Sequence, residues 1–352
     1  MSTQIPTTPP AAPAPATNRI QLSKADYKGG ESTLCGGCGH DAITSQIISA
    51  YYELGIPPHQ VIKMSGIGCS SKTPAYFLNR AWGFNSVHGR MPSVATGANL
   101  ANHQLLPIGV SGDGDTASIG MGQFIHMMRR NVRMVYVVEN NGVYGLTKGQ
   151  FSATADLGAK LKGGAVNELP GVDLCALAIE LGCGFVARSF SGDPKQLLQI
   201  LKAAIAHKGL AMIDVVSPCV TFNNHEGSTK SYTYAKAHEE PIHEIGFVSH
   251  FDPITADIPH GEMRDVPFPD GSHVRFRKIK EDFDPTSKIA AIELLHRTRT
   301  AGEILTGIFY LAPDRPSLAD LENLVDQPLA TLPESMTRPG PAALKQIMDE
   351  LT

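Results

Sequence analysis

Two polar segments of this 352-residue chain each follow an apolar run and carry residue types that bind metal ions. They are Gly112-Asp113-Gly114-Asp115 and Glu139-Asn140-Asn141. The interval between Asp113 and Asn141 has room for one helix and one strand, which would bring both segments to the same edge of a parallel sheet. A carboxylate and an amide oxygen there can hold a hard divalent cation, and that cation can hold a diphosphate.

Four alternative roles for the acidic segment can be compared with the sequence. An acidic surface turn is the simplest of them, because Asp and Gly both favour turns. An EF-hand calcium loop is excluded, since its fifth position would be Ala117 and no pair of helices frames it. The phosphate loop of nucleoside triphosphatases and the dinucleotide fingerprint at the first strand turn are both absent. The remaining interpretation is Mg²⁺ held by Asp113 and Asn141, with ligand phosphates completing its octahedron.

The loop that follows the second apolar run is rich in groups that bind anions. Between Asn141 and Gln150 it contains three glycines, a threonine and a lysine. Backbone N–H groups, the Thr147 hydroxyl and the Lys148 ammonium can all donate hydrogen bonds to an anion. For Lys148 the alternative is a solvated surface lysine.

Four of the six cysteines lie in turn-forming sequence, beside Gly, Pro or Ser. They are Cys35, Cys38, Cys69 and Cys219. The last two follow predicted strands, so we expect all four to converge near the diphosphate segment. Tetrahedral zinc, an iron–sulfur cluster and a redox-active cysteine pair remain open. Neighbouring glycines offer N–H groups to cluster sulfurs, which favours the cluster over zinc.

The other two cysteines and two histidines are less specific. Cys175 and Cys183 lie in apolar sequence and are expected to be small core residues. His40 follows the close cysteine pair, and His88 begins a His-Gly-Arg segment. Each histidine is a candidate site residue or an ordinary turn or cap residue.

These segments must be positioned by alternating helices and strands. Helical spacing of apolar residues recurs at 47–54, 121–128, 174–181 and 197–204, and a further helix is expected at 288–297. Short apolar runs at 61–64, 105–110, 134–138, 185–187 and 212–216 are typical of buried strands. The alternation predicts an α/β fold with a doubly wound, mostly parallel sheet.

Composition limits the class of protein. The net charge is -4, with 18% charged and 42% hydrophobic residues, and no basic block is present, so a nucleic-acid ligand is not expected. No apolar run is long enough to span a membrane, and no secretion signal is apparent, which predicts a cytoplasmic protein. We expect a disordered Pro-rich extension at 1–20, with ordered structure from about Tyr27, a cofactor-binding α/β domain at 21–230 and a C-terminal extension at 231–352 that packs on the core and on a partner.

Taken together, the motifs resemble a known family. The Gly112-Asp113-Gly114 and Asn140-Asn141 segments are similar to the thiamine diphosphate signature. Five further motifs look like the β subunit of 2-oxoacid:ferredoxin oxidoreductases and occur in the family's order. They are Cys35–His40, Gly66–Cys69, His88–Arg90, Val143–Gln150 and Ser217–Phe222. The resemblance covers roughly residues 30 to 300 and implies a thiamine-diphosphate-binding domain of the diphosphate-holding type.

The resemblance also implies roles for individual residues. Cys35, Cys38, Cys69 and Cys219 match the ligands of one [4Fe–4S] cluster, and Asp113, Asn141 and the backbone oxygen of Val143 match the magnesium ligands. Residues expected around the thiamine diphosphate are His40, His88, Gly112, Gly114, Asp115, Tyr144, Gly145, Leu146 and Thr147. Lys72 and Lys148 match lysines near the substrate carboxylate and are the candidate catalytic residues.

The implied reaction is oxidative decarboxylation of a 2-oxoacid with coenzyme A to acyl-CoA and CO₂, with electrons passing through the cluster to ferredoxin. With a low-potential electron donor the same steps can run in reverse. The motifs look most like 2-oxoglutarate enzymes, with pyruvate or a branched 2-oxoacid as the alternative. The family places the carboxylate that activates the cofactor on an α subunit, so an αβ or α2β2 assembly is expected. Two other classes remain: a zinc-binding scaffold or electron-transfer subunit, and a non-oxidative thiamine decarboxylase.

Overall fold

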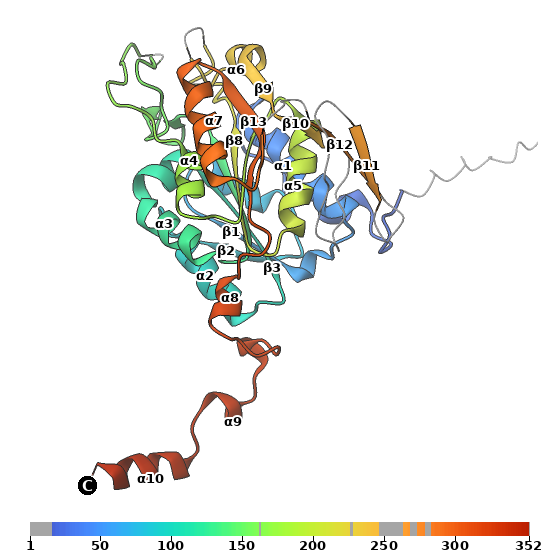
Figure 1. Cartoon of the computed structure of the whole chain (residues 1–352), viewed down its shortest axis with the longest axis vertical. Helices are drawn as coiled ribbons and strands as arrows, with labels where there is room; N and C mark the ends of the chain where they lie inside the picture. The colour runs from blue at the N-terminus through green and yellow to red at the C-terminus, as the bar shows by residue number, and fades with distance from the viewer. Residues whose placement is uncertain are drawn as a thin grey trace, which may run out of the picture.

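The computed structural model describes residues 16–161, 163–225, 228–245, 263–267, 273–278 and 283–351. Among these residues, eight strands form one sheet in the order β2-β1-β3-β4-β8-β7-β13-β9, with helices on both faces (Figure 1). The strands are β1 (Val61–Ser65), β2 (Trp82–Asn85), β3 (Leu106–Gly112), β4 (Met134–Asn140), β7 (Phe185–Phe190), β8 (Leu210–Val216), β9 (Glu239–Pro241) and β13 (Ile304–Leu311). The predicted α/β fold with a mostly parallel sheet is confirmed.

The central strands run parallel, so their carboxyl ends share one edge. β3 pairs in parallel with β1 and β4, and β8 pairs in parallel with β4 and β7. Every residue of β4 and β8 is buried, as expected for strands covered on both faces. The segments after β1, β3, β4 and β8 therefore meet at one edge of the sheet.

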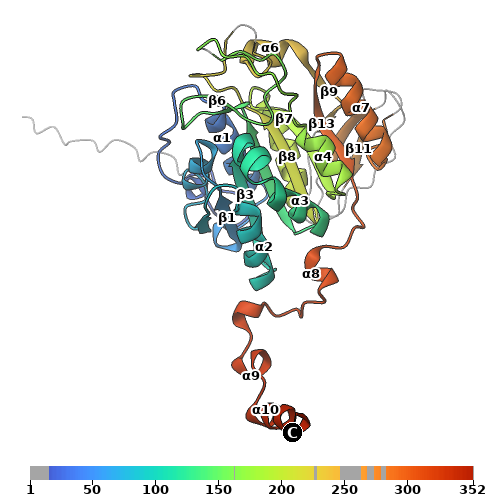
Figure 2. The same ribbon diagram turned by 90° about the vertical axis from the view of Figure 1, so that its left-hand side faces the viewer.

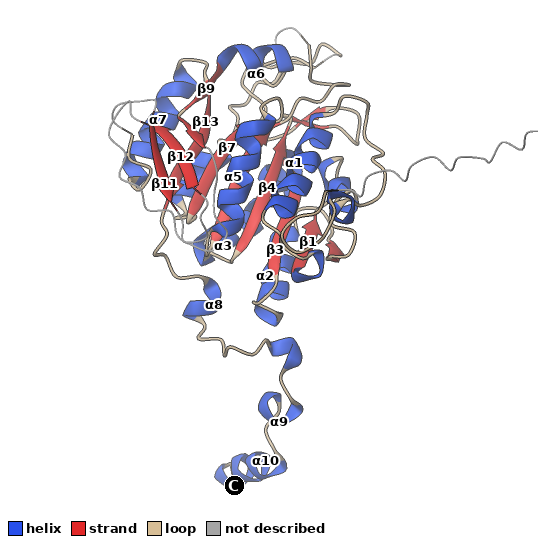
Figure 3. Cartoon of the chain, turned by 90° about the vertical axis from the view of Figure 1, so that its right-hand side faces the viewer, coloured by secondary structure: helices blue, strands red, loops and turns tan. Residues whose placement is uncertain are grey.

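Two helical layers cover the sheet (Figures 2 and 3). The helices α1 (Gly39–Glu53) and α5 (Pro194–Ala206) pack together on one face, around a core that includes Ile47 and Leu201. The opposite face carries α2 (Met91–Ala101), α3 (Met121–Arg130), α4 (Leu174–Glu180) and α7 (Lys288–Thr300). Smaller elements are the hairpin β5 (Val143–Tyr144) and β6 (Gln150–Phe151), the helix α6 (Tyr232–His238), and the sheet of β10 (His243–Ile245), β11 (Met263–Pro267) and β12 (His273–Lys278).

The chain makes specific contacts before Tyr27, earlier than the sequence predicted. Asn18 donates side-chain hydrogen bonds to Tyr27 Oη and to the carbonyl oxygen of Tyr52. Arg19 donates to the carbonyl oxygen of Leu54, at the end of α1. The Pro-rich segment up to residue 15 lies outside the described residues.

The C-terminal part contributes to the core and then leaves it. The strand β13 lies between β7 and β9 and runs antiparallel to β7, and α7 packs on α4. A segment expected to pack on the core thus completes the sheet itself. Beyond it, α8 (Leu318–Leu321) still packs on the core through Leu318, whereas α9 (Glu334–Thr337) and α10 (Pro341–Glu350) extend away from the body (Figure 1).

A largely buried ion-pair cluster supports the sheet beside β8. The Arg188 side chain donates to Asp214 at 2.8 Å and to Asp173 at 2.8 Å. Asp173 also caps α4, where it accepts the N–H groups of Cys175 and Ala176. Burial raises the pKa of Asp173, but the charge of Arg188 and these hydrogen bonds outweigh it, so the pKa is lowered.

Arg188→Met is therefore expected to destabilise the fold by about 3–5 kcal/mol, because it leaves two buried carboxylates without their cation. The pKa of Asp173 is lower in the folded than in the unfolded protein. Its ion pair therefore stabilises the fold fully at pH values above the unfolded pKa of about 3.9, and this stabilisation is lost as the pH falls through the folded pKa. In urea unfolding, the free energy of unfolding of the wild type should exceed that of Arg188→Met by a large margin at pH 7, and this difference should shrink below about pH 4.

The matched control is Arg338→Met in the C-terminal segment. Arg338 also pairs with a carboxylate, Glu334, at 2.6 Å, but both side chains are exposed. Its removal should change stability by no more than about 0.5 kcal/mol. Equal effects of the two substitutions would contradict the structural role assigned to Arg188.

Candidate active site

A pocket with an empty volume of about 500 Å³ opens at the carboxyl edge of the sheet. It is formed by the segments that follow β1, β3 and β4, and by the β5–β6 hairpin. Thirteen of the predicted site residues line it: His40, Cys69, His88, Gly112, Asp113, Gly114, Asp115, Asn141, Val143, Tyr144, Gly145, Leu146 and Thr147. The structure thus brings together most of the residues singled out from the sequence.

Asp113 lies at the base of this pocket, directly after β3. Its carboxylate accepts the N–H of Asn141 at 3.2 Å and the hydroxyl of Thr154 at 2.7 Å, and Ser152 donates to it as well. Burial raises the pKa of Asp113, and these hydrogen bonds oppose that shift. The two predicted side-chain ligands of magnesium are therefore neighbours, and the orientation of the carboxylate is set by several donors.

A buried hydrogen-bond network extends from Asp113 into the core. The Thr154 hydroxyl oxygen also lies 3.0 Å from Asn140 Oδ1, and Asn140 donates to Asp214 Oδ1 at 2.9 Å. Asp214 in turn accepts from Arg188. The ion-pair cluster beside β8 is therefore connected to the predicted magnesium ligand through Thr154 and Asn140.

Asp115 holds two loops together at the side of the pocket. Its carboxylate accepts the N–H of Gly89 at 2.8 Å and is also bonded to the backbone of Ile67. A Cβ at Gly66 would lie 1.8 Å from Asp115 Oδ2, so a residue with a side chain does not fit there. The structure thus gives Asp115 a role in fixing the loops after β1 and before α2.

The β5–β6 hairpin forms one wall of the pocket. The Tyr144 hydroxyl donates to the carbonyl oxygen of Gly114 at 3.2 Å, which closes the hairpin over the Asp113 segment. The Thr147 hydroxyl donates to Gln150 within the turn. Leu146 is half exposed at the mouth of the pocket.

The two candidate catalytic lysines do not line the pocket. Lys148 is exposed at the tip of the hairpin, with a φ of 79°. The ammonium of Lys72 lies 3.5 Å from Thr33 Oγ1, close to the loop that carries Cys35. Their catalytic role stays a prediction.

The four predicted cluster cysteines lie close to one another, beside the pocket. The hydroxyl of Thr221 donates to Cys35 Sγ at 3.5 Å. A Cβ at Gly145 would lie 3.5 Å from Cys69 Sγ and 3.7 Å from Cys219 Sγ. Charge on Cys219 acts on the pKa of both Cys38 and Cys69. Cys175 and Cys183, in contrast, are buried in the core as predicted.

Glu139 is fully buried and also lines the pocket, although the sequence analysis named it only as part of the Glu139-Asn140-Asn141 segment and gave it no role of its own. Neither carboxyl oxygen has a hydrogen-bond partner among the described residues, and His40 Nδ1 lies 3.5 Å from Oε2. Burial raises the pKa of Glu139 well above its usual value and lowers the pKa of His40 to about 4. Both groups therefore favour their uncharged forms. The signal that points to Glu139 is an acidic residue at the end of an otherwise apolar strand.

Within the described ranges, no group of three or more His, Cys, Asp or Glu side chains is arranged to hold a single metal ion. The predicted magnesium ligands include an amide and a carbonyl oxygen, and cysteines around a cluster bind different irons. Neither predicted site therefore depends on such a group. No helix in the described part of the chain is both long and apolar enough to cross a membrane.

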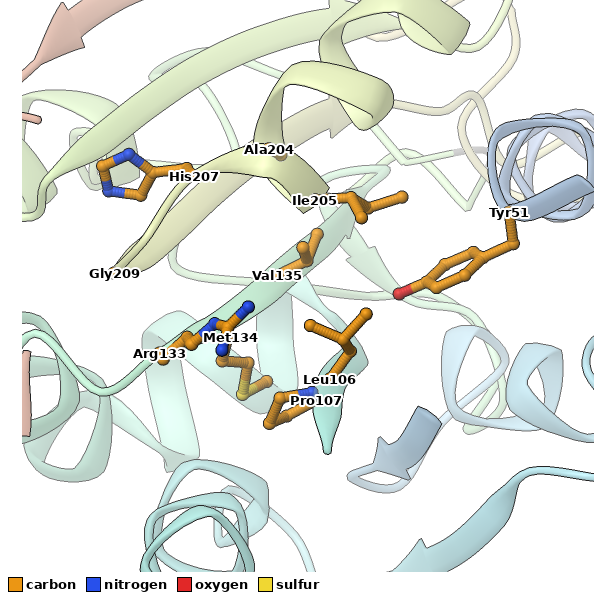
Figure 4. A pocket seen from close by; sticks show the side chains of 10 residues that line it. All are labelled: Tyr51, Leu106, Pro107, Arg133, Met134, Val135, Ala204, Ile205, His207 and Gly209. Atoms are coloured by element: carbon orange, nitrogen blue, oxygen red, sulfur yellow. The ribbon is translucent and has the colours of Figure 1, made fainter. Parts of the chain in front are cut away.

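A second, smaller cavity lies at the opposite edge of the sheet (Figure 4). Its walls include Leu106, Met134 and Gly209, at or before the starts of β3, β4 and β8. Tyr51 Oη and His207 Nε2 have no hydrogen-bond partner among the residues that the structure describes. None of the predicted site residues lines this cavity.

Comparison with known proteins agrees with the geometry of the site. The family "Thiamine pyrophosphate enzyme, C-terminal TPP binding domain" matches residues 66–215, which include the Asp113 segment and the Asn141 segment. A 2-oxoacid:ferredoxin oxidoreductase β subunit of Saccharolobus solfataricus is 44% identical over 221 residues, which are 62% of this chain and 70% of that protein.

Two longer matches extend over nearly the whole chain. A solved 2-oxoglutarate:ferredoxin oxidoreductase from Magnetococcus marinus, with 2-oxoglutarate, coenzyme A and succinyl-CoA bound, aligns with a TM-score of 0.71 and 30% identity, covering 94% of this chain and 96% of that chain. The β subunit of 2-oxoacid:ferredoxin oxidoreductase 1 from Aeropyrum pernix is 38% identical over 320 residues, which are 91% of this chain and 88% of that protein. The chain therefore belongs to the β subunits of the 2-oxoacid:ferredoxin oxidoreductases.

Proposed function

We propose that this β subunit binds Mg²⁺–thiamine diphosphate in its pocket and a [4Fe–4S] cluster on its four clustered cysteines. With an α subunit, it converts a 2-oxoacid and coenzyme A to acyl-CoA and CO₂ and passes the two electrons released to ferredoxin. The observation that carries the proposal is the position of Gly145, which lines the pocket and lies beside the Sγ atoms of Cys69 and Cys219. The same backbone segment would thus contact both cofactors.

The residues of the pocket suit a magnesium diphosphate. Asp113, Asn141 and the carbonyl oxygen of Val143 are oxygen donors of the kind that Mg²⁺ prefers. Gly112, Gly114 and Gly145 line the wall beside them, so backbone atoms face the pocket, while the space that a side chain at Gly114 would need is filled by the Tyr144 ring. Bound thiamine diphosphate supplies an electron sink for cleavage of the 2-oxoacid, and the protein supplies position and electrostatics.

The cysteines suit metal binding better than thiol redox chemistry. Burial raises the pKa of Cys38 to about 12 and also raises the pKa of Cys69. Redox-active cysteine pairs instead have a lowered pKa, because the thiolate is the reactive form. Thiolates at these positions are therefore favoured by the positive charge of a bound metal. The Thr221 hydroxyl donates to the sulfur of Cys35, as expected around an iron–sulfur cluster.

An α subunit is part of the proposal because the pocket is open. The described part of this chain supplies the diphosphate end of the site, and the pocket lining includes the exposed apolar side chains of Ile119 and Leu146. A partner that covers the mouth of the pocket would bring the carboxylate that activates the cofactor and would exclude water from the reaction.

2-Oxoglutarate is the proposed substrate. The solved relative with a TM-score of 0.71 binds 2-oxoglutarate, coenzyme A and succinyl-CoA. In an anaerobic, coenzyme A-dependent viologen assay of the co-expressed α and β subunits, kcat/KM for 2-oxoglutarate should exceed that for pyruvate by at least about tenfold, since pyruvate lacks the second carboxylate. A preference for pyruvate or a branched 2-oxoacid would reject this substrate and keep the reaction class.

The same preparation tests the cofactors. Iron and acid-labile sulfide should be present in about equal amounts, near four atoms each per β subunit. Zinc without acid-labile sulfide would reject the redox function, and aldehyde release without viologen reduction would indicate a non-oxidative decarboxylase.

A further inference from the structure

The segment that carries Cys219 and the segment that carries Asn141 are joined by a buried side chain, that of Asn223. Its Nδ2 donates to the carbonyl oxygen of Asn141 at 2.8 Å. Its backbone N–H donates to the carbonyl oxygen of Cys219 at 2.9 Å. The residue is only 5% exposed. One asparagine is thus bonded at the same time to a predicted magnesium ligand and to a predicted cluster ligand.

The contact at the magnesium side is closely constrained. The N–H of Asn141 donates to Asp113 Oδ1, and its Oδ1 accepts the N–H of Val143 at 3.0 Å. The hydrogen bond from Asn223 therefore holds the carbonyl oxygen of Asn141, a residue whose side chain and N–H are already held by other hydrogen bonds. Gly142 has a φ of +75°, and a Cβ there would lie 3.1 Å from Asn223 Nδ2, so the two segments approach without an intervening side chain.

The cysteine side is a tight turn. Cys219 and Asn223 form an antiparallel bridge that closes the turn between them. Phe222 packs against Gly149 of the hairpin, where a Cβ would lie 2.9 Å from its ring. The position of the Cys219 sulfur therefore depends on a turn that Asn223 ends and links to the pocket.

We propose that Asn223 is a positioning residue that fixes the separation between the thiamine diphosphate site and the iron–sulfur cluster. The inference rests on the proposed function, because it requires both cofactors. Without the amide donor, the carbonyl oxygen of Asn141 loses this partner and the Cys219 turn is released from the magnesium segment. A shift of either segment changes both the ligand geometry and the distance that electrons must cross.

The test is Asn223→Ala in the αβ complex, with two readouts that do not depend on turnover. The affinity for thiamine diphosphate with Mg²⁺, measured by titration of the cofactor-depleted complex, should fall about 10- to 100-fold, as for other residues that orient metal ligands. The electron paramagnetic resonance spectrum of the dithionite-reduced cluster should change in its g values or line width, while the iron content stays at the wild-type level.

Asn224→Ala is the matched control. Asn224 is exposed, and its side chain accepts the N–H of Tyr232 instead of touching the magnesium segment. It should leave both the affinity and the spectrum unchanged. If the alanine variant does not fold, Asn223→Ser, which also removes the amide donor but keeps a small polar side chain, is compared with the control in its place.

The outcomes separate the inference from the function on which it rests. Wild-type affinity or an unaltered spectrum in a folded Asn223 variant would overturn the role of Asn223, since both changes are required of a residue that joins the two segments. A wild-type complex without iron and thiamine diphosphate would instead reject the proposed function, and this inference with it.

Discussion

Asp113→Ala is expected to abolish retention of thiamine diphosphate while the iron–sulfur cluster stays in place. The substitution removes the carboxylate that lies beside Asn141 and accepts hydrogen bonds from Ser152 and Thr154. Loss of an outer partner of a metal ligand typically costs about 10–100-fold in affinity, so loss of the ligand itself should weaken binding by at least about 100-fold. Cofactor content after gel filtration and the Mg²⁺ dependence of binding measure this effect.

Two comparisons make the Asp113 result specific. The iron content should equal that of wild type, because the cysteines lie on other segments. Asp314→Ala, which removes an exposed carboxylate in the turn after β13, should change neither cofactor. If the Asp113 variant retained thiamine diphosphate at wild-type strength, the magnesium ligands would have to be assigned elsewhere.

The central fold could be predicted because its strands are buried on both faces. The run Met134–Val138 falls within β4, and the run Met212–Val216 within β8, since both are continuously buried without alternation. The edge strand β2 was missed, because Trp82 and Phe84 are exposed and the strand exists only through pairing with β1. The strand β13 was not predicted either, and its antiparallel pairing with β7 could not be read from the sequence, because an apolar segment carries no information about the direction in which it pairs.

The convergence of the site was predictable for a topological reason. Loops after parallel strands share an edge, so the segments of Asp113, Asn141 and Cys219 had to be neighbours once the strands were assigned. The contacts of Thr154 and Asn223 were not predictable, because they depend on how loops fold back beyond the strand ends.

Short sequence motifs identified segments of the site but not the directions of their side chains. Lys148 belongs to a loop rich in anion-binding groups, yet its side chain is exposed outside the pocket. Asp115 belongs to the acidic segment, yet its carboxylate is bonded to the backbone of two loops. In both cases spacing identified the segment, whereas the direction of the side chain is a property of the folded loop.

Cys219→Ser is the second substitution with a large expected effect, which is the loss of iron from the proposed cluster. A serine oxygen replaces a thiolate at the turn that Asn223 closes, and serine is a poor ligand for iron in these clusters. Iron should fall from about four atoms to about three or fewer per β subunit, and reduction of ferredoxin should fall at least about 100-fold. Iron and sulfide analysis with electron paramagnetic resonance measures the first effect, and a ferredoxin reduction assay measures the second.

Cys183→Ser provides the matched control for the cysteine substitution. The thiol of Cys183 is buried in the core within hydrogen-bonding distance of the carbonyl oxygens of Phe185 and Leu210, and a serine hydroxyl can donate to either of them. This variant should retain the full iron content, whereas Cys219→Ser should lose iron and still bind thiamine diphosphate through Asp113. An unchanged iron content in Cys219→Ser would remove Cys219 from the cluster, and a cluster held without it would have no ligand on the turn that joins the two cofactors.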